Sequence, residues 1–161
     1  SMKLKDDGVR REYGTGAVRD TAEGKGRCDL LPLGIIAAYL EDGVLSYIND
    51  YIRKGNTIAL WLAFEEFTRV AQIDDYTALL EAAKQYEDGA NKYDERNWEK
   101  GIPSHCYIDS AVRHYLKWCR SDTDEPHDRA FIWNILGAIW THENKPEMID
   151  LPFITKEKEG A

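Results

Sequence analysis

DYTALLEAAKQYEDGANKY, residues 75–93, is the stretch that decides the fold class. Its apolar residues recur with the spacing of one face of an α-helix. Asp74 or Asp75 suits the N-cap, because a short side chain with an oxygen can accept from the free N–H groups of the first turn. The stretch therefore predicts a long amphipathic helix, which runs into the polar sequence KYDERNW at residues 92–98.

Helical patterns also lie on both sides of this stretch. They are LGIIAAYLEDGVLSYINDYI (33–52), TIALWLAFEEFTRVAQI (57–73), HCYIDSAVRHYLKWC (105–119) and HDRAFIWNILGAIWTHE (127–143). Pro126 suits the first turn of the last helix, where its missing N–H costs nothing. The sequence therefore predicts an all-α protein with its helices packed as a bundle.

The chain is expected to form one domain. With 161 residues, 43% of them apolar, it can bury a full core without disulfides. Residues 1–34 are rich in glycine and arginine and show no sustained helical or strand period, so they predict a loop or arm. Residues 35–145 form the predicted helical core, and residues 146–161 form a tail.

Charge and cysteine usage exclude several classes of protein. Lys and Arg total 21 against 29 for Asp and Glu, a net charge of −8, which argues against binding a nucleic acid polymer through the overall field. The three cysteines are scattered without a CxxC spacing, so a reducing cytoplasm is expected and a zinc knuckle is not. No apolar run reaches the ~18 residues of a membrane span, so no membrane partner is expected.

Several carboxylates fall on the apolar faces of the predicted helices. Since a helix turns about 100° per residue, Glu87 shares a face with Leu79, Leu80 and Ala83. Asp128 projects onto the apolar stripe of the last helix. The remaining two acids are Asp109, at the edge of the core side of its helix, and Asp124, which aligns with Asp128 if that helix begins early.

A buried carboxylate needs a cation, a donor or a proton, because burying its charge alone costs several kcal/mol. Several inward acids on facing helices indicate a shared divalent ion, and oxygen ligands favour Mg²⁺ or Mn²⁺. The predicted metal ligands are therefore Glu87, Asp109, Asp124 and Asp128. Structural roles stay open for three of them: Asp124 as an N-cap, Glu87 paired with Lys84 or Lys92, and Asp128 paired with Arg113.

The histidines allow two interpretations. His127 and Asn134 lie on one side of the last helix, which suits a ligand with a supporting amide. His114 lies on the opposite flank of its helix from Asp109, so one of the two has another role. His105 and Cys106 are adjacent and are expected to point in different directions, so ordinary packing is predicted.

Glu65 and Arg69 have the spacing of an ion pair on a helix surface, and a structural role is predicted for them and for Glu66.

Five segments together resemble the N-terminal domain of the phage-associated dATP/dGTP diphosphohydrolases, a MazG-like group. They are GTGAVRD (14–20), GKGRCDLLP (24–32), YEDGANKYDERNWEKGIP (86–103), DSAVRH (109–114) and HDRAFIWNIL (127–136). The resemblance implies an all-α, metal-dependent enzyme that cuts a purine dNTP between its α and β phosphates. It also implies a homo-oligomer with helix-borne acids on Mg²⁺ or Mn²⁺, placed in the host cytoplasm if a phage encodes it.

Two features depart from that pattern. The stretch 37–80 is longer than the resemblance implies, which suits a lid, an oligomer interface or a substrate filter. The EExxE signature of MazG enzymes is absent, because Arg69 stands where a third acid is expected after Glu65 and Glu66. The ligands are therefore expected elsewhere, at Glu87 and near residues 109 and 124–128.

The two lines of inference predict a catalytic group of Glu87, Asp109 and His127 around a metal-bound water that attacks the α phosphorus. Basic side chains neutralise the triphosphate, and Asn97 with Trp98 reads or stacks the base. The full set of predicted substrate contacts is Lys25, Arg27, Lys92, Tyr93, Arg96, Asn97, Trp98, Arg113, His114 and Asn134.

A protein of another class also fits these residues. A phage factor that sequesters a nucleotide or a nucleotide-derived signal needs the same basic loop and aromatic side chains, but it needs no complete metal cluster.

Overall fold

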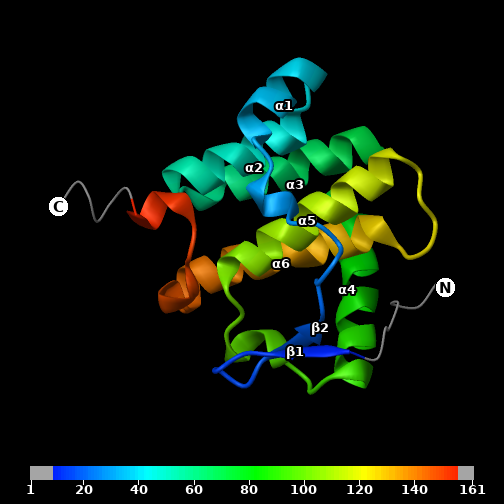
Figure 1. The fold of residues 1–161 in the computed structure, drawn as a ribbon. Coiled ribbons are helices and arrows are strands. Elements are labelled where there is room, and N and C mark those ends of the chain that lie inside the picture. Colours follow the sequence, from blue (N-terminus) through cyan, green and yellow to red (C-terminus); the bar gives the residue numbers. More distant parts are fainter. Residues whose placement is uncertain (1–8, 156–161) are drawn as a thin grey trace.

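The computed structural model describes residues 9–155 and is all-α apart from one short hairpin, as the sequence predicts (Figure 1). Six α-helices carry the fold within this range. They are α1 (Leu33–Leu40), α2 (Gly43–Lys54), α3 (Thr57–Ala71), α4 (Asp75–Lys92), α5 (Ser104–Cys119) and α6 (His127–Asn144).

The caps fix where these helices begin. The Asp74 carboxylate accepts from the backbone N–H of Thr77 at 2.9 Å and starts α4, as the sequence predicts. The single helix expected over 33–52 is instead two helices. Glu41 takes a left-handed conformation with φ 52°, and Asp42 then caps α2 by accepting from Leu45 N at 2.9 Å.

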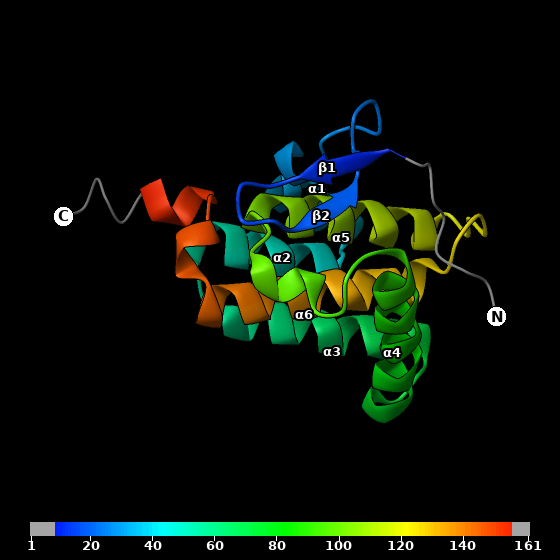
Figure 2. The same cartoon turned by 90° about the horizontal axis from the view of Figure 1, so that it is seen from below.

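α6 is the central helix of the bundle. It lies beside α5 and also contacts α3 and α4 (Figures 1 and 2). The helices α2 and α3 pair with each other on the side of the molecule opposite the strands β1 and β2 (Figure 2). Aromatic rings join these helices: Phe67 on α3 packs against Phe131 on α6 with 4.6 Å between ring centroids, and against Trp118 on α5 at 5.0 Å.

α4 runs at a steep angle to α5 and α6 (Figure 1), and it turns a different face inward from the one predicted. Ala78 and Ala82 are buried, whereas Leu80 is 70% exposed. Glu87 is exposed, so the expectation that it points into the core is wrong. The small alanine side chains allow α4 to approach its neighbours closely, and a face of leucines would hold it further away.

The segment expected to lack strands forms an antiparallel hairpin of β1 (Arg10–Glu12) and β2 (Val18–Asp20), which lies against the side of α5 (Figure 2). Asn97 fastens it to the loop after α4: its Oδ1 accepts from Val18 N at 2.9 Å, and its Nδ2 donates to Val18 O at 2.8 Å. A short 3-10 turn, η1 (Cys28–Leu30), then leads toward α1.

The beginning of the tail packs on the core. After the short turns η2 (Asn97–Lys100) and η3 (Pro146–Met148), Phe153 is buried beside Tyr51, with 5.5 Å between ring centroids. Residues 1–8 of the predicted arm and 156–161 of the predicted tail lie outside the described residues. Within residues 9–155, none of the helices combines the length and apolar character needed to cross a membrane.

Candidate functional site

A cavity of about 690 Å³ opens between the C-terminal half of α4, the hairpin, α5 and the start of α6. This volume lies within the usual range for small-molecule sites. Lining residues come from segments as far apart in the chain as Arg11 and Asn134, so the cavity exists only because the hairpin folds back onto the bundle.

The cavity is basic although the chain is acidic. Among the described residues, its lining contains three acidic side chains, Asp20, Asp94 and Glu125. The same part of the lining contains seven basic ones: Arg11, Arg19, Lys25, Arg96, Arg113, Lys117 and Arg120. In a chain of net charge −8, this concentration of positive charge favours a ligand that carries several negative charges.

Arg19 forms part of the cavity wall. Its Nη2 donates to Ser110 Oγ at 3.0 Å and to Asn134 Oδ1 at 3.1 Å, and its guanidinium lies over the rings of Tyr107 and Trp133. Among the described residues, its buried Nη1 has no hydrogen-bond partner. The guanidinium is therefore held in place with one unsatisfied donor group.

Asp109 is buried, as predicted, but its oxygens are already used. Oδ1 accepts from Cys28 N at 2.7 Å, and both oxygens accept from Arg113 Nη2, at 2.6 and 2.7 Å. Arg113 Nη2 also donates to Gly26 O at 2.5 Å. This network holds the glycine-rich loop against α5. Because these donors balance the charge of the Asp109 carboxylate, its burial does not require a metal ion.

The KYDERNW segment forms one side of the cavity, and several of its side chains are held by ion pairs or hydrogen bonds. Lys92 pairs with Asp20, and Tyr93 donates to the same carboxylate at 3.0 Å. Burial, followed by the charge of Asp20 and this hydrogen bond, raises the pKa of Tyr93. Asn97 is occupied with Val18, so its amide holds the hairpin instead of facing outward.

An aromatic wall stands on the α4 side. Tyr86 packs against Trp98 and Trp133, with ring centroids 5.8 and 5.9 Å apart, and all three rings line the cavity. Gln85, one residue earlier on α4, also lines it and is only 6% exposed. Its Oε1 is buried and has no hydrogen-bond partner among the described residues, so this acceptor is unsatisfied.

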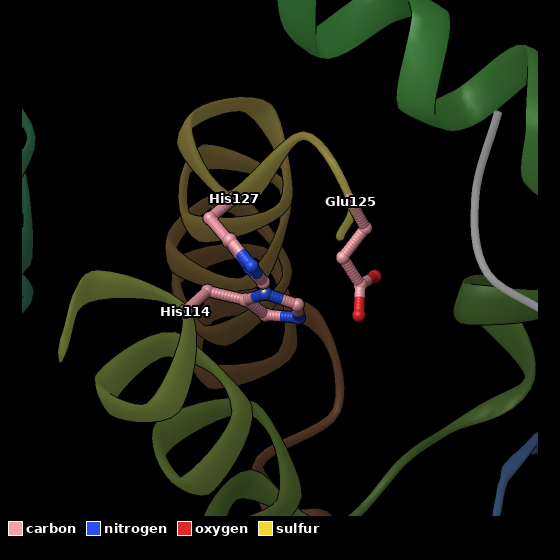
Figure 3. Close-up of side chains that lie close together, drawn as sticks. All are labelled: His114, Glu125 and His127. Carbon is pink, nitrogen blue, oxygen red and sulfur yellow. Dashed lines mark hydrogen bonds between the residues drawn. The ribbon is translucent and has the colours of Figure 1, made fainter. Parts of the chain in front are cut away.

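Two histidines meet where α5 faces the start of α6 (Figure 3). The Nδ1 atoms of His114 and His127 are 2.8 Å apart, and His127 Nε2 lies 2.6 Å from Asp124 Oδ1. Burial and the nearby His127 lower the pKa of His114 to about 3. The hydrogen bond from His127 lowers the pKa of Asp124 to about 2. At neutral pH the group therefore contains a neutral imidazole and an ionised carboxylate.

Most of the predicted substrate contacts meet at this cavity. Those that line it are Lys25, Tyr93, Arg96, Asn97, Trp98, Arg113, His114 and Asn134. Arg27 and Lys92 are not among the described lining residues; Arg27 pairs with Asp29 at 2.7 Å, and Lys92 pairs with Asp20.

The predicted carboxylate set does not converge. Glu87 is exposed on the outer side of α4, Asp109 is bound by Arg113, and Asp128 is half-buried in the first turn of α6. Of the four acids, only Asp124 belongs to a described cluster of potential ligands, with Asp122 and His127.

The two lysines suggested as partners of Glu87 pair with other carboxylates. Lys84 pairs with Glu81, and Lys92 with Asp20. Pro126 occupies the N-cap of α6, so Asp124 does not cap it. On α3, Arg69 pairs with Glu66 at 2.5 Å instead of Glu65, because the side chain turns back three residues instead of four.

Sequence reasoning missed several residues of the site, among them Arg19, Gln85 and Glu125. Arg19 stands in a segment without a periodic pattern, so nothing in the sequence predicts its direction. The signal for Gln85 was present, since it lies three residues after Ala82 on the face that is buried.

His105 and Cys106 do contact each other, contrary to the expectation. His105 Nε2 lies 3.6 Å from Cys106 Sγ, and Asp150 Oδ2 lies 2.5 Å from His105 Nδ1. Burial acts to raise the pKa of the Cys106 thiol, but hydrogen bonds from His105 and Tyr13 lower it overall. The sulfur is only 2% exposed and is not among the described atoms of the cavity wall, so it has a packed, hydrogen-bonded position.

Comparison with known proteins gives one match. The family model of the dATP/dGTP diphosphohydrolase N-terminal domain matches residues 65–151, which is more than half of the chain. This region contains KYDERNW, α5 and α6, whereas the glycine-rich motifs at 14–20 and 24–32 precede it. Neither the curated proteins nor the solved structures searched contain a match to the chain. The family name indicates hydrolysis of nucleotides, and the chain belongs to the dATP/dGTP diphosphohydrolase N-terminal domain family.

Proposed function

We propose that the protein hydrolyses a purine deoxynucleoside triphosphate between its α and β phosphates, releasing a monophosphate and pyrophosphate. One observation carries this proposal: a cavity whose wall has seven basic and three acidic side chains, in a chain of net charge −8, beside an aromatic wall. A nucleoside triphosphate combines the two matching chemistries, since it joins a polyanion to a flat base.

The phosphates are held by arginine and lysine side chains from several segments. Arg19 Nη1 is a donor without a partner among the described residues, and its guanidinium is fixed by Ser110 and Asn134. Arg113 and Lys117, on α5, add charge to the same wall. Arginine suits this role because its planar donors can contact two phosphate oxygens together.

The base lies against the aromatic wall. Tyr86, Trp98 and Trp133 offer ring surfaces to a purine. Gln85 Oε1 accepts an N–H of the base, because a buried acceptor without a partner strongly favours a ligand that supplies a donor. Rotation about the last side-chain torsion is enough to redirect this amide.

Metal dependence is part of the proposal, but the four carboxylates predicted from the sequence do not converge as one set of ligands, and only Asp124 lies in a described cluster. Glu87 is exposed, and Asp109 accepts three hydrogen bonds from Cys28 N and Arg113 Nη2, so neither is given a step in the reaction. A divalent ion beside the cavity would neutralise phosphate charge and make a bound water more acidic. The side chains named above bind the nucleotide, orient its α phosphorus and exclude bulk water.

The products test the reaction. The protein is incubated with each dNTP and with Mg²⁺ or Mn²⁺, and the products are separated by ion-exchange chromatography. Monophosphate and pyrophosphate in equal amounts are expected, with purine substrates used fastest. Release of inorganic phosphate, or of inorganic tripolyphosphate together with the nucleoside, would contradict the assigned bond. Tight binding of uncleaved nucleotide would show a sequestering protein instead.

A further inference from the structure

Three potential metal ligands converge where α5, the loop after it and α6 meet (Figure 3). They are His114 on α5, Glu125 in the loop and His127 at the first position of α6. One donor atom from each lies within 4.8 Å of the other two. The two imidazole rings are tilted by 40° and meet at their nitrogen atoms, and the Glu125 carboxylate lies beside them (Figure 3).

The two imidazoles are already spaced as ligands of one ion. Their Nδ1 atoms are 2.8 Å apart, and two nitrogens bound at about 2.1 Å and about a right angle lie roughly 3 Å apart. A hydrogen bond between two imidazole nitrogens needs one proton between them. Replacing that proton by a metal ion therefore requires the rings to move apart and to turn, so that both nitrogen lone pairs point at the ion.

Asp124 supports the same interpretation. His127 Nε2 lies 2.6 Å from Asp124 Oδ1, so this nitrogen carries the proton that the carboxylate accepts. Metal-bound histidines commonly donate their second N–H to a carboxylate in this way, which directs the other nitrogen at the ion. Asp122 and Asp124 also place carboxylates around His127, where Arg120 pairs with Asp122 at 2.5 Å and Lys117 Nζ lies 3.5 Å from Asp124 Oδ2.

We propose that His114, Glu125 and His127 form a site for a divalent transition-metal ion such as Mn²⁺, Co²⁺ or Zn²⁺. Two imidazoles and one carboxylate favour these ions over Mg²⁺, which prefers oxygen ligands. His114 and Glu125 both line the cavity, so the remaining coordination positions face the space where phosphates are proposed to bind. The site depends only on the donor geometry, so it is independent of the proposed hydrolysis.

The test uses the metal alone. Protein freed of metal by a chelator is titrated with Co²⁺, binding is measured by calorimetry, and the visible absorption reports the ligands. One ion per chain is expected, with a visible spectrum that indicates nitrogen ligation. His127→Gln should abolish this binding, and Asp124→Asn should weaken it about 10- to 100-fold.

Matched controls separate this site from other histidines and acids. His105→Gln and Asp128→Asn change the same residue types outside the cluster, so both should bind Co²⁺ as the original protein does. His114→Gln and Glu125→Gln provide further tests if His127→Gln does not fold, as judged by circular dichroism. Unchanged Co²⁺ affinity in folded His114→Gln and Glu125→Gln proteins would overturn the proposal, whatever the nucleotide assay shows.

Discussion

Arg129 on α6 donates to Asp88 on α4 across 2.7 Å, and the two side chains are 3% and 21% exposed. This ion pair fixes which face of α4 turns toward the bundle. Glu87, about 100° further round the helix, is directed to solvent as a result.

Asp88→Asn should therefore destabilise the protein by about 2 to 3 kcal/mol, because the buried Arg129 loses a charged acceptor. Urea unfolding measures the change. Glu87→Gln removes the same charge one residue away and should change the free energy of unfolding by less than about 0.5 kcal/mol. Equal losses in both variants would show that the pair does not fix α4.

Arg19→Lys should weaken binding of a non-hydrolysable dNTP analogue roughly 10- to 100-fold, because lysine keeps the charge but loses the fixed planar donors. Calorimetry gives the dissociation constant, and thermal unfolding checks the fold. Arg27→Lys is the control, since Arg27 pairs with Asp29 outside the described cavity wall. The assignment of Arg19 fails if the two variants bind equally well.

Gln85→Leu should reduce discrimination between dGTP and dITP, which lacks the exocyclic amino group. When dITP binds to the original protein, the buried acceptor Gln85 Oε1 receives no donor from the base. Leucine at this position has no acceptor, so dGTP and dITP should bind more equally. The ratio of the two kcat/KM values is expected to fall about 10-fold. Asn91→Leu, on the exposed side of α4, should keep the original ratio, and a ratio preserved in Gln85→Leu would exclude this base contact.

The His105–Asp150 pair should make stability depend on pH. The hydrogen bond with Asp150, followed by that with Cys106, raises the pKa of His105 from 6.5 to about 10. Because folding raises the pKa of His105, the protonated imidazole stabilises the folded state. This stabilisation is fully present below pH 6.5 and is lost as the pH rises toward 10. Both side chains are partly exposed, so the effect is modest.

Asp150→Asn tests this dependence by thermal unfolding. The midpoint should fall relative to the original protein near pH 6.5, and the difference should shrink toward pH 10. A difference that stays constant across this range would show that the pair does not titrate as described.

The sequence by itself determined the helices and much of the chemistry near the cavity. Periodicity and caps are local properties, so Asp74 and the apolar spacing predict α4 without any knowledge of its neighbours. The same local reasoning could not find the β-hairpin, because its strands are short and Asn97, a distant residue, holds β2.

Only the tertiary structure decided which face of each helix is used. Periodicity fixes the angle between Glu87 and Asp88 but not which of them turns inward; close packing of Ala78 and Ala82 and the pair with Arg129 decide that. The meeting of His114 with His127 likewise depends on how α5 lies against α6. Contacts between helices depend on the shapes of both partners, and a pattern read along one helix contains only one of them.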